Sequence, residues 1–233
     1  MTASPTHAAP SAADSAARVV SVQVGRIAPL GPEGVPSGFV KRPVDRPVAV
    51  TDLGLAGDEQ ADLRVHGGSE KAVYGYAHAA YAEWRETFPE HGAMLVPGAF
   101  GENLTIDGTD EEQVCIGDIV RVGTATLQIA QPRQPCFKLA LRFADRRMPR
   151  AMIRNGRSGW YYRVLATGVV AAGDGHAVLA RPNPHWSMAR FNRLLAAKAW
   201  PTSDLAELIH LPGLASGWRD IARSTLADAS RNT

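Results

Sequence analysis

A single cysteine stands between two cations in the segment Gln131-Pro132-Arg133-Gln134-Pro135-Cys136-Phe137-Lys138-Leu139. Cationic neighbours lower the pKa of a thiol and favour the thiolate, which is the form that binds metals or acts as a nucleophile. The flanking prolines hold the backbone extended and disfavour a regular helix. The segment therefore indicates a reactive or metal-binding Cys136. The alternative is an inert buried cysteine beside two surface cations.

A second cluster contains residues that suit a phosphate-bearing ligand: Arg64, His66, Gly67, Gly68 and Lys71. Arginine forks, lysine charge and exposed backbone N–H groups are the usual partners of a phosphate, and glycines let the backbone approach it closely. Because histidine titrates near neutral pH, His66 could deliver a proton to a reacting group. The alternative for His66 is a structural role in a turn.

Two further clusters place polar residues beside glycines, Gly57-Asp58-Glu59-Gln60-Ala61-Asp62 and Gly98-Ala99-Phe100-Gly101-Glu102-Asn103-Leu104. Asn103 offers an amide to a heterocyclic cofactor or to a substrate, whereas Glu102 is expected only to orient its neighbours. Asp58 is equally consistent with a turn cap and with a site residue. Each of these clusters is a weak signal when it is taken alone.

Composition indicates an ordinary globular protein. The 233 residues are 45% hydrophobic and 21% charged, with a formal net charge of +2, which is ample material for a core and no general argument for nucleic-acid binding. Charge is nevertheless uneven, because Asp145 is the sole acid in the arginine-rich stretch from Arg133 to Arg163. That stretch indicates either a solvated face or a site for a phosphate-bearing ligand.

The remaining compositional features concern compartment. Cys115 and Cys136 are too few for a disulfide framework and lack zinc-site spacing, which favours a reducing compartment. No apolar run approaches the roughly 20 residues that span a membrane. The first 17 residues are rich in Ala, Ser, Pro and Thr and lack the regions of a secretory signal. We therefore expect a cytoplasmic protein with a disordered leader over residues 1–17 and no membrane partner.

The hydrophobic pattern predicts a mainly β fold with some helix. Short apolar runs separated by turn residues predict strands at 19–24, 47–50, 104–106, 113–116, 119–122, 126–130, 161–165 and 168–171. Apolar residues near helical spacing predict one helix over residues 72–88. The spacing of the strands favours a β-barrel or sandwich over a doubly wound sheet.

The chain changes character after Arg181-Pro182-Asn183-Pro184. Three amphipathic helices are predicted to begin near Ser187, Ser203 and Ser216. The expected organisation is a β-barrel domain over residues 18–181 and a three-helix domain over residues 185–230. Because three short helices bury too little surface to be stable alone, we expect them to pack on the barrel or on the second subunit of a homodimer.

Taken together and in this order, the clusters resemble the MOSC domain, the C-terminal module of molybdenum-cofactor sulfurases, and especially its stand-alone YiiM-like subgroup. The resemblance extends from about Val19 to Leu226 and includes three further matching segments, Lys71-Ala72-Val73-Tyr74, Ile116-Gly117-Asp118 and Gly159-Trp160-Tyr161-Tyr162-Arg163-Val164. It implies a MOSC-type β-barrel followed by a small three-helix segment. It also implies a cleft for the molybdenum cofactor, a pterin (molybdopterin) whose dithiolene holds the metal and which carries a phosphate.

The resemblance also implies roles for individual residues. Cys136 would be the molybdenum ligand or a sulfur carrier, and His66 would assist catalysis beside it. The candidates for holding the cofactor are Arg64, Gly67, Gly68, Lys71, Asn103, Arg133 and Lys138. At the level of the whole family, the resemblance extends to pyridoxal phosphate binding and detoxification.

Stand-alone members similar to this chain are linked to the reduction of small N-hydroxylated substrates such as 6-hydroxylaminopurine. Electrons would come from a separate flavoprotein or ferredoxin-type reductase, because the chain has no GxGxxG fingerprint and no iron–sulfur cysteine set. Two alternatives remain open. One is a sulfur carrier with a persulfide on Cys136. The other is a binding module for nucleic acid, which the near-neutral charge and the lack of a known motif disfavour.

Overall fold

The central element of the structure is an eight-stranded sheet of order β13-β9-β10-β11-β7-β8-β1-β4. The structure is a computed structural model that describes residues 17–62 and 67–231. Strands β7 and β8 pair in parallel, and the other neighbours in this sheet are antiparallel. The strands are β1 Arg18–Val24, β4 Arg42–Pro43, β7 Val73–Ala77, β8 Leu104–Asp107, β9 Ile119–Val122, β10 Ala125–Pro132, β11 Trp160–Ala166 and β13 His176–Ala180.

Two smaller sheets complete the β structure of the described residues. The first has the order β12-β5-β6 and the second pairs β2 with β3. Their strands are β2 Ala28–Leu30, β3 Val35–Ser37, β5 Val48–Thr51, β6 Gly54–Leu55 and β12 Gly168–Val170. The predicted strand at 113–116 is wrong, because this segment makes only a single bridge, between Cys115 and Ser187.

The expected closed barrel is not present among the described strands. The large sheet ends at β13 and β4, and these two strands do not pair with each other. The sheet curls far enough for Val19 N to donate to Asp174 O at 2.8 Å. The contact is short, however. Besides the Arg18–Gly175 bridge, Gly173 N donates to Val19 O and His176 N donates to Ala17 O, both at 2.8 Å. The fold is a mixed α/β fold built on a large, curled sheet.

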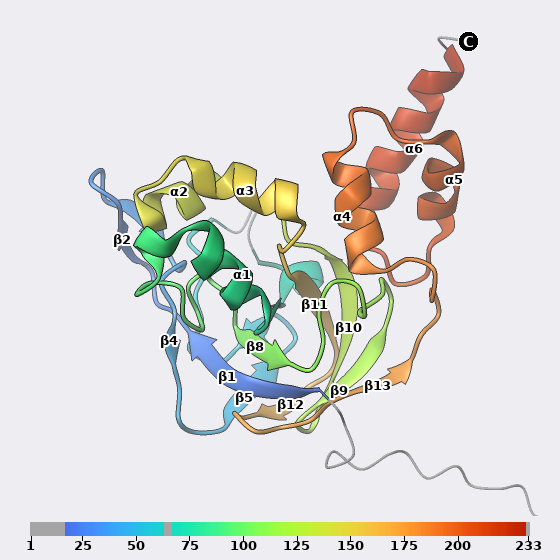
Figure 1. The fold of residues 1–233 in the computed structure, drawn as a ribbon. Coiled ribbons are helices and arrows are strands. Elements are labelled where there is room, and N and C mark those ends of the chain that lie inside the picture. Colours follow the sequence, from blue (N-terminus) through green and yellow to red (C-terminus); the bar gives the residue numbers. More distant parts are fainter. Residues whose placement is uncertain (1–16, 63–66, 232–233) are drawn as a thin grey trace, which may run out of the picture.

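Six α-helices occur in the described residues, where the sequence predicted one before residue 181 and three after it. They are α1 Ala80–Thr87, α2 Phe137–Phe143, α3 Arg147–Asn155, α4 Met188–Ala196, α5 Thr202–His210 and α6 Ser216–Arg231, with the 3-10 turns η2 Ser69–Lys71 and η3 Pro89–His91. Helices α1, α2 and α3 gather on one side of the sheet, and α4, α5 and α6 form a second group (Figure 1).

The three C-terminal helices are confirmed, and Ser187 caps α4 by accepting a hydrogen bond from Arg190 N at 3.1 Å. The helix predicted over residues 72–88 is wrong in its first half, which is strand β7. All five residues of β7 are buried, so the strand has no alternating polar face that would distinguish it from a helix. Helix α3 escaped prediction because it contains Pro149, but a proline is tolerated in the first turn of a helix.

Two hydrophobic cores flank the large sheet. One includes Val73 together with sheet residues and residues from all three C-terminal helices, among them Phe191, Leu208 and Trp218. The other includes Tyr74 and Tyr76 together with residues of α1, α2 and α3. Strand β7 is buried on both faces because Val73 enters the first core, whereas Tyr74 and Tyr76 enter the second. The division into domains at residues 181–185 stays a prediction.

Within residues 17–62 and 67–231, no helix is both long and apolar enough to cross a bilayer.

The tight contact between β7 and the start of β11 predicts an unequal response to two glycine substitutions. Gly159 and Gly173 both have positive φ, but a Cβ at Gly159 would lie 2.3 Å from Gly75 O, whereas a Cβ at Gly173 meets nothing within 4 Å. Gly173→Ala should cost about 1–2 kcal/mol of left-handed strain. Gly159→Ala should cost about 1–3 kcal/mol more through overpacking. Urea unfolding of both variants measures the difference, and equal midpoints would contradict the contact.

Candidate functional site

Most of the predicted site residues line a single pocket. Gly67, Lys71, Asn103, Arg133, Cys136 and Lys138 all face this cavity, which encloses about 620 Å³ of space that is partly open to solvent. Gly68 lies next to it as the cap of η2, with φ 81°, but does not line it. Arg64 and His66 lie outside the described residues.

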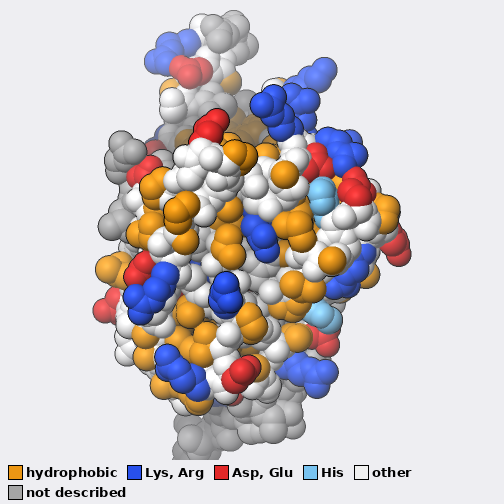
Figure 2. Space-filling model, turned by 90° about the vertical axis from the view of Figure 1, so that its left-hand side faces the viewer, with side chains coloured by type: hydrophobic (Ala, Val, Ile, Leu, Met, Phe, Trp, Pro, Cys, Tyr) orange, Lys and Arg blue, Asp and Glu red, His pale blue; other side chains and the backbone are white. Residues whose placement is uncertain are grey.

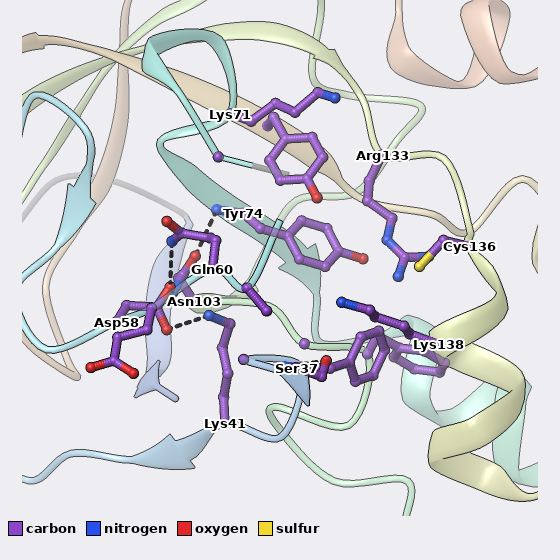
Figure 3. A pocket seen from close by; sticks show the side chains of 18 residues that line it. Ser37, Lys41, Asp58, Gln60, Lys71, Tyr74, Asn103, Arg133, Cys136 and Lys138 are labelled. Carbon is purple, nitrogen blue, oxygen red and sulfur yellow. Dashed lines mark hydrogen bonds and ion pairs between the residues drawn. The ribbon is translucent and has the colours of Figure 1, made fainter. Parts of the chain in front are cut away.

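One wall of the pocket carries Arg133, Cys136 and Lys138, from the end of β10 and the start of α2. The prolines keep residues 133–135 out of regular structure as predicted. Cys136 is the N-cap residue of α2, which begins at Phe137. In Figure 3 the guanidinium of Arg133 lies beside the sulfur of Cys136, whereas the Lys138 side chain extends into the pocket with its amino group on the side of Tyr74. Cys136 is a free, half-buried cysteine. Arg133 therefore lies beside the Cys136 thiol, and Lys138 lines the same pocket.

Arg133 is 5% exposed. Its guanidinium lies 5.8 Å from the Phe39 ring and 5.7 Å from the Tyr74 ring, and Nη1 donates to Met152 Sδ at 3.2 Å. Burial opposes the charge, yet the pKa of Arg133 is raised because Tyr74, Tyr161 and Cys136 interact favourably with it. No ion pair within the described part of the chain joins Arg133 to a carboxylate. A buried guanidinium in this setting is suited to an anionic ligand.

Two lysines that line the pocket, Lys138 and Lys71, differ in their surroundings. Lys138 is buried, and its Nζ donates to Pro36 O at 3.2 Å. Lys71 is half-buried, and its pKa is lowered because burial disfavours its charge more than neighbouring Glu70 supports it. Both lysines line the pocket that Cys136 also lines.

The opposite wall is held together by the carboxylate of Asp58. It accepts hydrogen bonds from Gly25 N at 2.8 Å, Asn103 Nδ2 at 2.9 Å and Gln60 Nε2 at 3.3 Å. It also forms an ion pair with Lys41 (Figure 3), and the two side chains are 1% and 7% exposed. Burial lowers the pKa of Lys41, and Asp58 partly offsets this effect. Asp58 thus joins segments that are far apart in sequence into one wall.

Asn103 and Glu102 hold the backbone of this wall. Asn103 Oδ1 accepts from Tyr74 N at 3.0 Å, and its Nδ2 donates to Gln23 O at 3.2 Å as well as to Asp58. Glu102 is fully buried and accepts from Gly98 N at 2.7 Å and Thr105 Oγ1 at 2.9 Å. Glu102 orients its neighbours as expected. The Asn103 amide is engaged at both ends with the protein, although the residue lines the pocket.

Several pocket residues were not singled out as site candidates, notably Phe39, Lys41, Tyr74 and Tyr161. Tyr74 belongs to the Lys71-Ala72-Val73-Tyr74 segment, so a signal for it existed. Lys41 comes from a loop with no motif, and its role depends on contact with Asp58, 17 residues later. Trp160 and Tyr162 are core residues.

The arginine-rich stretch has mixed roles. Arg147, Arg157 and Arg163 form ion pairs with acidic side chains from other segments. Arg146, Arg150 and Arg154 are exposed around α3 and border a surface hollow. On the face shown in Figure 2, basic side chains are interspersed with apolar and acidic ones, and the largest basic group lies at the upper edge. Much of the stretch is thus accounted for as ion pairs and solvated surface.

Comparison with known proteins gives the family. The profile of the MOSC domain matches residues 62–176. Protein YiiM of Escherichia coli (strain K12) is 44% identical over 153 residues, which cover 66% of this chain and 68% of that protein. The crystal structure of YiiM from Geobacillus stearothermophilus is 32% identical and has a TM-score of 0.77, with 90% of this chain and 99% of that chain covered. The chain therefore belongs to the MOSC domain family.

Within this family the chain is similar to the YiiM proteins, in agreement with the resemblance seen in its motifs. Another relative, named Reductase, comes from Gibberella moniliformis (strain M3125 / FGSC 7600). It is 39% identical over 216 residues, which cover 91% of this chain and 38% of that protein. The chain thus spans little more than a third of the length of that relative.

The buried Lys41–Asp58 pair predicts a large loss of stability on removal of one partner. Asp58→Asn should cost about 3–5 kcal/mol, because it leaves the Lys41 charge buried without a counter-charge. The double variant Lys41→Met/Asp58→Asn should recover part of that loss. Glu59→Gln is the control, since Glu59 lies 3.9 Å from the exposed Arg26 and should cost less than about 1 kcal/mol. Chemical denaturation measures all three, and equal losses in the single and double variants would contradict the role of the pair.

Proposed function

We propose that this chain binds the molybdenum cofactor in the pocket and reduces small N-hydroxylated compounds such as 6-hydroxylaminopurine. The observation that carries the proposal is the buried guanidinium of Arg133, which has no carboxylate partner among the described residues and lies beside the Cys136 thiol. Arginine forks and lysine amines suit a pterin phosphate, and a thiolate is a suitable ligand for a soft or high-valent metal. The donor set of the pocket therefore fits the cofactor that the family implies.

The cationic residues of the pocket and the Cys136 thiol have separate roles in this proposal. Arg133, Lys138 and Lys71 hold the anionic groups of the cofactor, with Arg64 and Gly67 as further candidates near the same segment. Cys136 supplies the thiolate ligand, which its cationic neighbours stabilise. When bound, the cofactor supplies two-electron redox chemistry at molybdenum.

The overall reaction consumes two electrons and two protons, breaks the N–O bond, and releases the amine and water. His66 is the proposed proton donor. Lys71 is a second proton source, because its lowered pKa brings its ammonium group closer to the range in which general acids work. The electrons come from a separate flavoprotein or ferredoxin-type reductase. Support for a separate donor comes from the cysteine content, since the sequence contains only two cysteines, too few for a four-cysteine iron–sulfur cluster.

A sulfur-carrier function for Cys136 is the second candidate. It is favoured by the position of this thiol, which is half-buried and lines the cavity, so a persulfide there would be accessible to an acceptor. Mass spectrometry and cyanide treatment distinguish the two functions. A cyanide-labile sulfur on Cys136 in protein that contains neither molybdenum nor pterin would favour the carrier.

The proposal predicts that activity and metal content depend on Cys136 and not on Cys115. The protein should be purified from a host that makes the cofactor, analysed for molybdenum and pterin, and assayed with 6-hydroxylaminopurine and reduced methyl viologen as electron donor. Cys136→Ser should lose bound molybdenum and turnover. Cys115→Ala is the matched control, because Cys115 is buried against Pro184 O and does not line the pocket. Full turnover in Cys136→Ser would refute the assigned role.

A further inference from the structure

A second cavity lies next to the pocket and shares Cys136 with it. This groove runs between the segment Gln131–Cys136 and helix α6, and it contains about 950 Å³ of space that is partly open to solvent. Lys71 and Tyr161 also line both cavities. Cys136 therefore stands where the two spaces meet, so a molecule in either space lies next to this residue.

The wall of the groove formed by α6 is anchored by Glu70. The carboxylate of Glu70 accepts from Ser216 N at 3.0 Å and Ser216 Oγ at 3.0 Å, and it pairs with Arg163 at 2.9 Å. A carboxylate at the first turn of a helix is also favoured by the helix dipole. Helix α6 is thus fixed to η2 beside Lys71, so the groove has a defined width.

The floor of the groove is equally well fixed. Gln131 Nε2 donates to Glu70 O at 2.9 Å, and Gln131 Oε1 accepts from Trp218 Nε1 at 3.2 Å. The Trp218 ring lies 5.2 Å from the Phe191 ring and 6.2 Å from the Trp200 ring. Because its Nε1 bonds Gln131 and its ring packs against Phe191 and Trp200, the Trp218 side chain is held in one position beside the groove.

The lining of the groove suits a planar, uncharged heterocycle. Trp218, Tyr161, two prolines and the 46% exposed Ile221 provide apolar surface. Gln134 is exposed, and its amide makes no hydrogen bond within the described part of the chain. A glutamine amide can bond the N6 and N7 edge of an adenine ring through one donor and one acceptor. No carboxylate lines the groove, so nothing in it requires a cationic ligand.

We propose that the groove is the substrate site, in which the ring of a planar N-hydroxylated base lies against Trp218 and Tyr161 with its edge at Gln134. The N–OH group then points to Cys136, where the groove meets the cofactor pocket. This inference rests on the proposed function and adds where the substrate binds. The N–O bond breaks at that junction, with two electrons from the external reductase and two protons, and the amine product leaves through the groove.

Gly217 allows this assignment to be tested without disturbing the core. It lies in α6 at the edge of the groove, and a Cβ there meets nothing within 4 Å. Gly217→Phe should fill the groove and weaken the binding of adenine, the amine product, by about tenfold or more, because stacking on the groove wall is worth about that much per base. Gln134→Ala should weaken it several-fold through loss of the amide.

Calorimetry with adenine on the purified holoenzyme gives this readout independently of turnover. Gly217→Phe should also lose reduction of 6-hydroxylaminopurine while retaining reduction of the much smaller N-methylhydroxylamine. Arg223→Phe is the matched control, because Arg223 is exposed and lies on another face of α6, where it pairs with Asp220. It should bind adenine as the unaltered protein does.

The outcomes separate the two proposals. Adenine binding and purine reduction that are unchanged in Gly217→Phe would overturn the groove assignment and leave the proposed function standing. Failure of the unaltered, molybdenum-loaded protein to reduce either substrate would overturn the proposed function. Adenine binding that Gly217→Phe abolishes would still support the groove as a site for planar bases.

Discussion

The burial of a permanent positive charge is the constraint on which the site depends. An arginine cannot lose its proton in a protein, so Arg133 must be solvated by whatever surrounds it. The described surroundings are two aromatic faces, a thioether, phenol groups and a thiol, with no carboxylate among them, and the thiol supplies a counter-charge only in its thiolate form. An isolated buried charge costs several kcal/mol. An anionic ligand would balance the guanidinium charge, which is the role that the proposed function gives to the cofactor phosphate.

The wall of the pocket that carries Arg133, Cys136 and Lys138 could be predicted because one short segment of the sequence forms it. Arg133, Cys136 and Lys138 lie within six residues of one another, and each residue type has its own chemical meaning. The opposite wall depends on contacts between distant segments, such as Lys41 with Asp58 and Asn103 with Asp58. No single residue of that wall has a type or spacing that indicates a site. Asp58 could be read as a cap or as a site residue, and only its four donors show that it organises the wall.

The fold was predictable where side chains alternate and not where burial is complete. Strands β9 and β10 alternate between buried and partly exposed positions over most of their length and were recognised, whereas β7 is buried throughout and was taken for helix. Helices α2 and α3 follow a proline-rich segment, and the prolines hid them. The open edge of the sheet was also unpredictable, since it depends on whether β1 and β13 meet along their length. The strand composition is the same for a closed barrel and for a curled sheet.

Glu70 gives the C-terminal helices a significance beyond their packing. Its carboxylate is shared between the first turn of α6 and Arg163 in β11. Detachment of α6 would therefore change the hydrogen bonding of the carboxylate that pairs with Arg163. The same detachment would separate Trp218 from Gln131 and expose part of a core common to sheet and helices. Local opening of the helical segment is therefore energetically coupled to the sheet. The helices and the sheet should exchange their amide hydrogens as a single cooperative unit.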